Sequence, residues 1–214
     1  MSSDNSFSSY TDFVNSAEEL EKIAGVPLPQ IIDKELSALD QMCRDFIAIS
    51  SFCLIASANP DGHLDISPRG DPAGFVQILS DTMFAIPDRP GNKRVDTFHN
   101  VLKDPRVSVI FFVPGKMETL RIRGTARISA DPNLLATMTV NNHPPKLALL
   151  IHVETVFAHC PKCVMRSHLW QPGDWPDSSQ LPNMNAMMVK HARIKSTPEE
   201  WFEHLKKSGE LDLY

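Results

Sequence analysis

The chain has 214 residues, a formal net charge of −5 at pH 7, 42% hydrophobic residues and 22% charged residues. This length is enough for one domain with a hydrophobic core, and the composition is ordinary for a globular protein. The acidic balance argues against a general nucleic-acid binder, because phosphate backbones select basic surfaces. A local basic pocket is still compatible with that balance.

The N-terminal segment and the cysteines indicate the compartment. The N-terminus has neither a positive start nor an apolar run, so it does not resemble a secretory signal. The longest apolar run, near 107–113, is too short to span a membrane. Cys43, Cys53, Cys160 and Cys163 form no disulfide framework for a chain of this size. We therefore expect a cytoplasmic protein without a membrane partner.

Helical signals lie mainly at the two ends of the chain. Residues 1–14 are Ser-rich and polar, and we expect them to be loose or to lie on a partner. Ser16 and Glu19 form a capping box, which predicts a helix that ends near Gly25. Apolar residues at three- and four-residue spacing predict a second helical region over about 31–49. Shorter helices are predicted at about 93–103, after the N-cap Asp131, and from Thr197 to Gly209.

From Phe52 onward the hydrophobic pattern changes to that of strands. FCLIASA and HLDIS around the turn NPDGH predict one hairpin, and 75–79 with 82–87 predict a second. The apolar run 107–113 predicts a strand buried on both faces. Residues 118–129 alternate, and 146–159 supply a last long strand. About six strands with few helices between them predict a mainly β (α+β) fold, a closed or half-closed barrel.

Two segments concentrate groups that could bind an anion. SPRGDPAGF, 67–75, combines an arginine with glycines that allow close backbone approach, although a turn with a surface arginine is the alternative. In 86–102 a Pro-Gly turn leads to Asn92, Lys93 and Arg94 at a predicted helix start, where free N–H groups favour an anion. Two cations there have the wrong sign for the helix dipole. Either a bound phosphate resolves this mismatch, or solvated side chains tolerate a small penalty.

The third segment is the polar face of 118–129. Arg121, Arg123 and Arg127 lie on one side of the predicted strand, where like charges repel unless acidic partners or an anionic ligand lie between them. Surface solubility is the alternative, and we favour it for Arg127.

The fourth segment, HCPKCVMRSHLW, covers 159–170. His159, Cys160 and Cys163 suggest zinc or dithiol chemistry, but a structural zinc site needs four ligands, and a redox C-x-x-C needs a βαβ context. Neither is present, so we expect no metal. The same segment predicts a cation-rich helix that ends at an aromatic residue, a combination that suits a flat anionic ligand such as a flavin or, alternatively, a packed core tryptophan. Its residues are Lys162, Arg166, Ser167 and Trp170.

Taken in order, several pieces carry a family resemblance. FAIP, GNKR, VDTFHNVLKDPR, VSVIFFV and ETLRIRGTARI resemble the pyridoxamine 5'-phosphate oxidase-like, FMN-binding split-barrel family. DISPRGDPAGF, PDRPGNKR and HCPKCVMRSHLW are similar to an uncharacterised FMN-dependent bacterial subgroup of it. The resemblance covers about 40–170. It implies a six-stranded split β-barrel with FMN at a homodimer interface.

The resemblance also implies an organisation and a set of site residues. The expected parts are an N-terminal tail and helical extension, 1–39, an FMN-binding split-barrel domain, 40–170, and a C-terminal loop and helix on the same domain, 171–214. Arg69, Lys93 and Arg94 would contact the phosphate and ribityl chain. The other cofactor-binding residues that it implies, some of them supplied by the partner subunit, are Ser67, Gly70, Ile86, Pro87, Asn92, Thr119, Lys162, Arg166, Ser167 and Trp170.

These expectations define the function hypotheses. The resemblance implies an FMN-dependent oxidoreductase with a small-molecule substrate and NADH or NADPH as candidate electron donor. The C-terminal substrate signature of true pyridoxamine phosphate oxidases is absent from 201–214, so the substrate is not named. The alternatives are a non-enzymatic flavin or haem binder and a phosphate-ligand module without redox work. No catalytic residue is assigned, and no nucleic acid is expected as a partner.

Overall fold

The computed structural model describes residues 7–214, and the chain divides into two units, Met1–Glu35 and Leu36–Tyr214. The prediction for residues 1–14 falls partly on 1–6, which lie outside the described residues. None of the helices formed by the described residues combines the length and apolar character that crossing a bilayer requires.

The first unit contains two short helices, α1 (Ala17–Ala24) and α2 (Pro29–Asp33). The Ser16 hydroxyl accepts from the backbone N–H of Glu19 at 3.1 Å, and Gly25 ends α1 with φ 80°. Both ends of this helix are therefore as predicted. The Glu19 carboxylate differs from a capping box, because it accepts from the N–H of Asn15 at 3.1 Å.

The predicted single helical region over 31–49 is wrong. Helix α2 ends at Asp33, and α3 covers Gln41–Ile49. Between them, Leu36 exchanges backbone hydrogen bonds of 2.9 and 2.8 Å with Val156, which requires an extended backbone. Asp40 then starts α3 as its N-cap, accepting from the N–H of Cys43 at 2.8 Å. Tertiary pairing thus overrides the helical spacing of the sequence.

The second unit is built on one antiparallel sheet of seven strands in the order β2-β1-β5-β6-β7-β4-β3. Its fold class is the predicted mainly β one, with one strand more than the six expected. Among the described residues no ladder joins the edge strands β2 and β3, so the barrel is half-closed. The strands are β1 (Phe52–Ala58), β2 (Leu64–Gly70), β3 (Gln77–Ser80), β4 (Met83–Pro87), β5 (Arg106–Phe112), β6 (Thr119–Ser129) and β7 (Ala148–His159).

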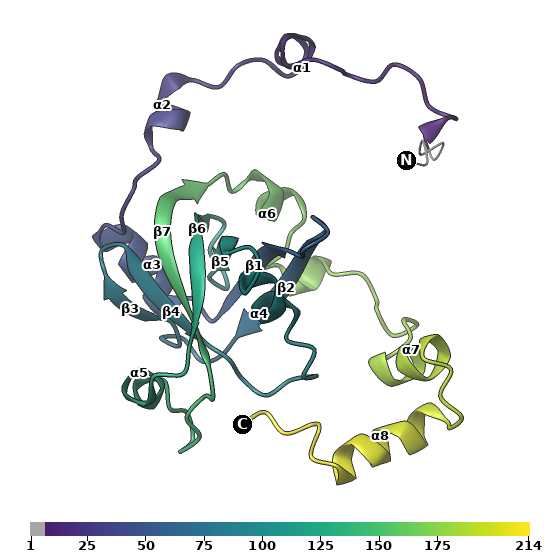
Figure 1. Cartoon of the computed structure of the whole chain (residues 1–214). Coiled ribbons are helices and arrows are strands. Elements are labelled where there is room, and N and C mark those ends of the chain that lie inside the picture. The colour runs from purple at the N-terminus through teal and green to yellow at the C-terminus, as the bar shows by residue number, and fades with distance from the viewer. Residues whose placement is uncertain (1–6) are drawn as a thin grey trace. The chain divides into compact units, whose positions relative to one another are not determined.

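The long strands β6 and β7 connect the two halves of this sheet (Figure 1). Strand β5 pairs with the first half of β6, whereas β4 pairs with the first half of β7, at the opposite end of the β6–β7 ladder. A register shift between Arg123 and Gly124 interrupts that ladder. A Cβ atom on Gly124 would lie 1.9 Å from the carbonyl oxygen of His152, so only glycine fits there.

The core lies on the inner face of the sheet and contains alternate residues of β1, β5 and β6, with Phe84 and Phe111 at its centre. Strand β5 was predicted to be buried on both faces, and this is wrong. Its buried residues alternate with half-exposed Ser108, Ile110 and Phe112. The outer face of this half of the sheet is therefore apolar and only partly covered.

Short helices complete the unit. They are α4 (Asp96–Val101), α5 (Pro132–Thr137), α6 (Lys162–Arg166), the 3-10 turn η2 (Pro172–Asp174), α7 (Met184–His191) and α8 (Pro198–Lys207). The predicted N-cap Asp131 and the capping box of Thr197 and Glu200 are both present. No sequence pattern had indicated α7. Helix α4 packs on β1, β2 and β6, and the buried Asn100 amide joins it to Ser57 and Asp65 at 2.9 and 2.8 Å.

Candidate functional site

One cavity of the second unit has a volume of about 680 Å³. Its walls are strand β2, the loop between β4 and α4, the loop at 143–146, and the C-terminal residues 208–214. The structure brings five of the predicted site residues together here, namely Ser67, Arg69, Asn92, Lys93 and Arg94. Strand β2 presents Ser67 and Arg69 by its two-residue period, because its inward positions alternate with exposed ones. Asn92, Lys93 and Arg94 come from the loop before α4.

The base of the cavity is an ion pair between strands that are not neighbours. Arg69 of β2 donates to the carboxylate of Asp88, just after β4, at 2.9 Å, and both side chains are largely buried. The guanidinium also lies over the Phe98 ring, 5.6 Å from its centroid. Burial raises the pKa of Asp88, because it disfavours the charged form, and Arg69 opposes that change. The pair thus brings the two halves of the sheet together.

Lys93 and Arg94 lie before the helix rather than within it. The helix predicted over 93–103 is shorter in the structure, where α4 covers only Asp96–Val101. It starts late because Lys93 and Val95 have a left-handed backbone, with φ 60° and 48°. The Asn92 side chain accepts from the N–H of Arg94 at 3.1 Å, which fixes the loop. A six-residue helix has a weak dipole, so an anion here would be held by side chains.

The positive charges of Lys93 and Arg94, which are unfavourable at a helix start, are paired with carboxylates of the chain itself. The ammonium of Lys93 lies 2.6 Å from a carboxylate oxygen of Glu210, and the guanidinium of Arg94 lies 2.8 Å from Asp96. The hydrogen bond from Arg94 to Asp96 raises the pKa of Arg94. A bound phosphate is therefore not needed to explain these cations, and it would have to compete with Glu210 and Asp96.

A buried pair forms the wall beside the ion pair. Arg89 donates to the carboxylate of Asp71 at 2.5 Å and to the carbonyl oxygen of Met138 at 2.7 Å. The Tyr214 hydroxyl donates to Asp71 at 2.6 Å, and its ring lies 5.6 Å from the Arg89 guanidinium. The hydrogen bond to Asp71 raises the pKa of Tyr214. This wall is therefore saturated by contacts within the chain.

Sequence reasoning missed several residues of the cavity. Asp88 and Arg89 lie inside the PDRPGNKR segment, so their place beside Lys93 could have been inferred from proximity. The 143–146 loop and the C-terminal residues Glu210 and Tyr214 carry no pattern that indicates a site. Within residues 7–214, Lys146 lines the cavity without a side-chain ion pair.

The other predicted site residues do not line this cavity. Ile86 and Pro87 are buried at the end of β4, directly before the cavity residue Asp88. Gly70 is the last residue of β2, and a Cβ atom added to it would lie 3.3 Å from the carbonyl oxygen of Ser51. The remaining residues lie near the other end of the β6–β7 ladder, where β6 begins and β7 ends. These are Thr119, Lys162, Arg166, Ser167 and Trp170.

Thr119 is buried, although the alternation in 118–129 puts it on the same face as the exposed Arg121 and Arg123. Its hydroxyl has no hydrogen-bond partner among residues 7–214. Trp170 lies near the same end of the sheet, where its indole N–H donates to the carbonyl of Lys116 at 2.7 Å. Thr119 pairs with His159, the last residue of the strand before α6. An unpartnered buried hydroxyl marks a place where a ligand or a partner subunit could bind.

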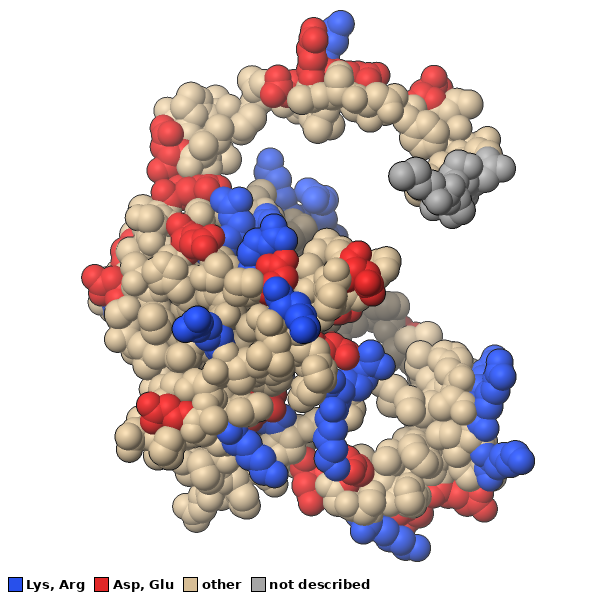
Figure 2. All heavy atoms as spheres, viewed as in Figure 1, with Lys and Arg blue, Asp and Glu red and all other residues tan. Residues whose placement is uncertain are grey.

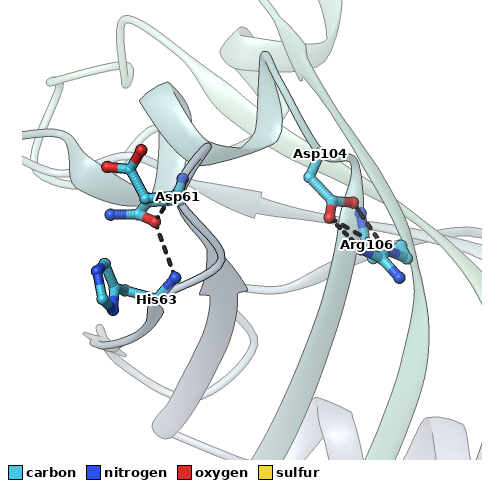
Figure 3. Close-up of polar contacts among 5 residues, drawn as sticks. Asp61, His63, Asp104 and Arg106 are labelled. Carbon is cyan, nitrogen blue, oxygen red and sulfur yellow. Dashed lines mark hydrogen bonds and ion pairs between the residues drawn. The ribbon is translucent and has the colours of Figure 1, made fainter. Parts of the chain in front are cut away.

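A second, more open cavity of about 990 Å³ lies at the β1–β2 turn and the start of β5. Figure 3 shows its polar contacts: the Asn59 side chain accepts from the N–H groups of Asp61 and His63 at 3.0 and 2.9 Å. Arg106 donates to both oxygens of Asp104, and these bonds lower the pKa of Asp104 to about 2. These contacts form the predicted NPDGH turn and begin β5. The charges of Asp104 and Arg106 are thus paired with each other.

All four cysteines lie in the second unit, Leu36–Tyr214. Cys43 and Cys53 are buried, whereas Cys160 and Cys163 are exposed, and all four are free thiols. No group of three or more His, Cys, Asp or Glu side chains within residues 7–214 is arranged to hold a metal ion. On the face shown in Figure 2, basic and acidic side chains are interspersed among uncharged residues.

A family comparison decides what kind of protein this is. The family model described as "Pyridoxamine 5'-phosphate oxidase" matches residues 39–160, more than half of the chain. The chain belongs to this family. Members of the pyridoxamine 5'-phosphate oxidase family typically bind FMN, although some bind other flavins or haem, and they are commonly dimeric. No curated protein matches the sequence.

Solved structures of similar fold have low identity to this pyridoxamine 5'-phosphate oxidase family member. HupZ of Group A Streptococcus is 20% identical over 56% of this chain and 93% of its own, with a TM-score of 0.46. A putative pyridoxamine 5'-phosphate oxidase of Lactobacillus delbrueckii is 16% identical over 58% and 98%, with a TM-score of 0.44. A conserved hypothetical protein of Mycobacterium tuberculosis is 14% identical over 67% and 96%, with a TM-score of 0.42.

Proposed function

We propose that the chain is an FMN-dependent oxidoreductase that binds the FMN phosphate in the 680 Å³ cavity. One observation carries this proposal: Arg69, Lys93 and Arg94 line one cavity in a member of a family that typically binds FMN. The donor set fits the group, because guanidinium and ammonium groups are the side chains that bind phosphate oxygens.

Each cavity residue has a proposed part in holding the cofactor. Lys93 and Arg94 bind the phosphate, while Arg69 contacts the phosphate and the ribityl chain from the base of the cavity. Ser67 and Asn92 add hydrogen-bonding groups from β2 and the pre-helical loop. When bound, FMN supplies the electron-transfer chemistry, and the protein supplies grip and orientation. No acid or base is assigned.

The remaining predicted residues suggest that the site is completed by a second copy of the chain. Thr119, Lys162, Arg166, Ser167 and Trp170 lie outside the cavity, and the Thr119 hydroxyl is buried without a partner among residues 7–214. The outer face of the half-sheet β2-β1-β5 is apolar, and Leu64 and Ile66 on edge strand β2 are 79% and 68% exposed. Apolar surface of this kind is typical of an interface. We therefore propose a homodimer.

The proposal extends to the compartment and the reaction partners. We propose a cytoplasmic location, a small-molecule substrate, and NADH or NADPH as the electron donor.

The test is the identity of the molecule that copurifies with the protein. We expect a yellow protein whose absorbance and released mass are those of FMN. NADPH or NADH should bleach the flavin absorbance, which should recover in air. A flavin or haem that binds but shows no redox response would favour the non-enzymatic alternative. A protein that binds neither FMN nor another flavin would refute the proposal.

A further inference from the structure

The C-terminal residues enter the cavity because of the way helix α8 ends. The N–H of Glu210 donates to the carbonyl of Leu205 at 3.1 Å, and the N–H of Gly209 donates to Lys206 at 3.4 Å. Gly209 has φ 72°, so the helix ends in the left-handed turn known as the Schellman motif. The helix end therefore fixes where Glu210 points. We name residues 208–214 the C-terminal latch.

The latch contacts two different parts of the cavity. A carboxylate oxygen of Glu210 lies 2.6 Å from the ammonium of Lys93, and Tyr214 donates to Asp71 at 2.6 Å. The Tyr214 contact is the buried one, since the Asp71 and Arg89 side chains are only 2% and 13% exposed. The Lys93 side chain is 78% exposed. The latch thus has a fixed anchor at Tyr214 and a weaker, exposed contact at Glu210.

We propose that the C-terminal latch competes with the anionic ligand of the cavity, an inference that rests on the proposed function. The Glu210 carboxylate sits on Lys93, where a phosphate oxygen of the ligand would bind. A phosphate-bearing flavin therefore binds by displacing Glu210, while Tyr214 keeps the latch nearby. When the phosphate leaves, Glu210 returns to Lys93. The latch acts as an internal counter-ion for Lys93 while no phosphate is bound.

The size of the effect follows from the exposure of the pair. Exposed ion pairs typically contribute a small stabilisation, which corresponds to a change in binding of about twofold to fivefold. Salt screens such pairs, so the effect should shrink as ionic strength rises.

The first test measures FMN affinity by flavin fluorescence in apoprotein of the full chain. Glu210→Gln removes the carboxylate charge from Lys93 and should tighten FMN binding by about twofold to fivefold at low salt. Asp212→Asn is the matched control, because it removes one negative charge from the same wall, and Asp212 has no ion pair with a cation among the described residues. Equal gains in the two variants, or weaker binding in Glu210→Gln, would overturn the latch.

A second measurement reads the latch without flavin. Hydrogen exchange of peptides covering 205–214 should be faster in Glu210→Gln and in Tyr214→Phe than in the unmodified chain. Unchanged exchange in both variants would overturn the latch. The two proposals can fail separately. If the chain binds no FMN but Glu210→Gln still speeds hydrogen exchange in 205–214, the latch stands and the proposed function fails. If the chain binds FMN but Glu210→Gln changes neither FMN affinity nor exchange, the proposed function stands and the latch fails.

Discussion

Arg69 of β2 and Asp88, the residue that follows β4, form a 2.9 Å ion pair although β2 and β4 are separated in the sheet by β1, β5, β6 and β7. The ladder leaves the barrel open along its edges, and this pair brings the two halves together at the base of the cavity. The cofactor cavity proposed here is therefore formed by the same curvature that makes the barrel.

The Arg69–Asp88 pair predicts a pH-dependent loss of stability. Burial places the folded-state pKa of Asp88 above its usual value, so Asp88 favours the folded state at low pH and opposes it as pH rises through the folded pKa. Arg69→Ala removes the guanidinium, which counteracts the rise in the pKa of Asp88. Urea unfolding should show a loss of about 1–2 kcal/mol at neutral pH that diminishes toward about pH 3.5. In an Asp88→Asn background, the stability lost through Arg69→Ala should no longer depend on pH. If Arg69→Ala alone lowers the free energy of unfolding equally at neutral and at acidic pH, Asp88 is not the group responsible.

Gly124 should be irreplaceable at the break in the β6–β7 ladder. An added Cβ would meet the His152 carbonyl at 1.9 Å, and backbone atoms cannot move aside as a flexible side chain can. We expect Gly124→Ala to lower the free energy of unfolding by roughly 2–4 kcal/mol. Gly173→Ala is the matched control, because nothing lies within 4 Å of its added Cβ. Similar denaturation midpoints for the two variants would show that the bulge is not constrained as described.

The cysteines should divide into two reactivity classes. Burial raises the pKa of both Cys43 and Cys53 to about 12, and the hydrogen bond with Asp40 adds to the effect at Cys43. Both thiols stay protonated near pH 8 and react slowly. Mass spectrometry after thiol alkylation should find Cys160 and Cys163 modified in the folded protein, and all four only after unfolding. Rapid labelling of Cys53 in folded protein would be inconsistent with the core.

The strands and most helix caps could be predicted from the sequence because their signals are local. Alternation in 118–129 identified β6, and Asp131 and Thr197 marked the starts of α5 and α8. The same reasoning failed at Leu36, where a backbone pairing with Val156 prevents a continuous helix. Local spacing does not contain such a long-range contact.

The candidate site was partly predictable for the same reason. Arg69, Lys93 and Arg94 lie in short segments rich in glycine, proline and cations, and the structure places all three in one cavity. Glu210 and Tyr214 were missed because their partners lie 117 and 143 residues away in the sequence. The left-handed backbone of Lys93 and Val95, which delays the start of α4, also has no signature in these non-glycine residues.

The apolar outer face predicts how the proposed dimer can be broken. Leu64 is 79% exposed on edge strand β2, so Leu64→Glu would place a charge in the interface, where burying it without a partner is costly. Sedimentation should show a monomer for this variant and a dimer for the unmodified chain. Leu181→Glu is the control, since Leu181 is exposed but lies outside the sheet. If Leu64→Glu stays dimeric, this face is not the interface.

The most direct test of the flavin site is FMN titration of the double variant Lys93→Ala and Arg94→Ala. Both side chains are exposed, so the variant should keep its fold, as circular dichroism can verify. Losing two charge-assisted contacts should weaken FMN binding by at least about 100-fold. Lys206→Ala with Lys207→Ala, which removes the same charge from α8 outside the cavity, should bind FMN normally. Stoichiometric FMN retained in the Lys93 and Arg94 variant would contradict the proposed site.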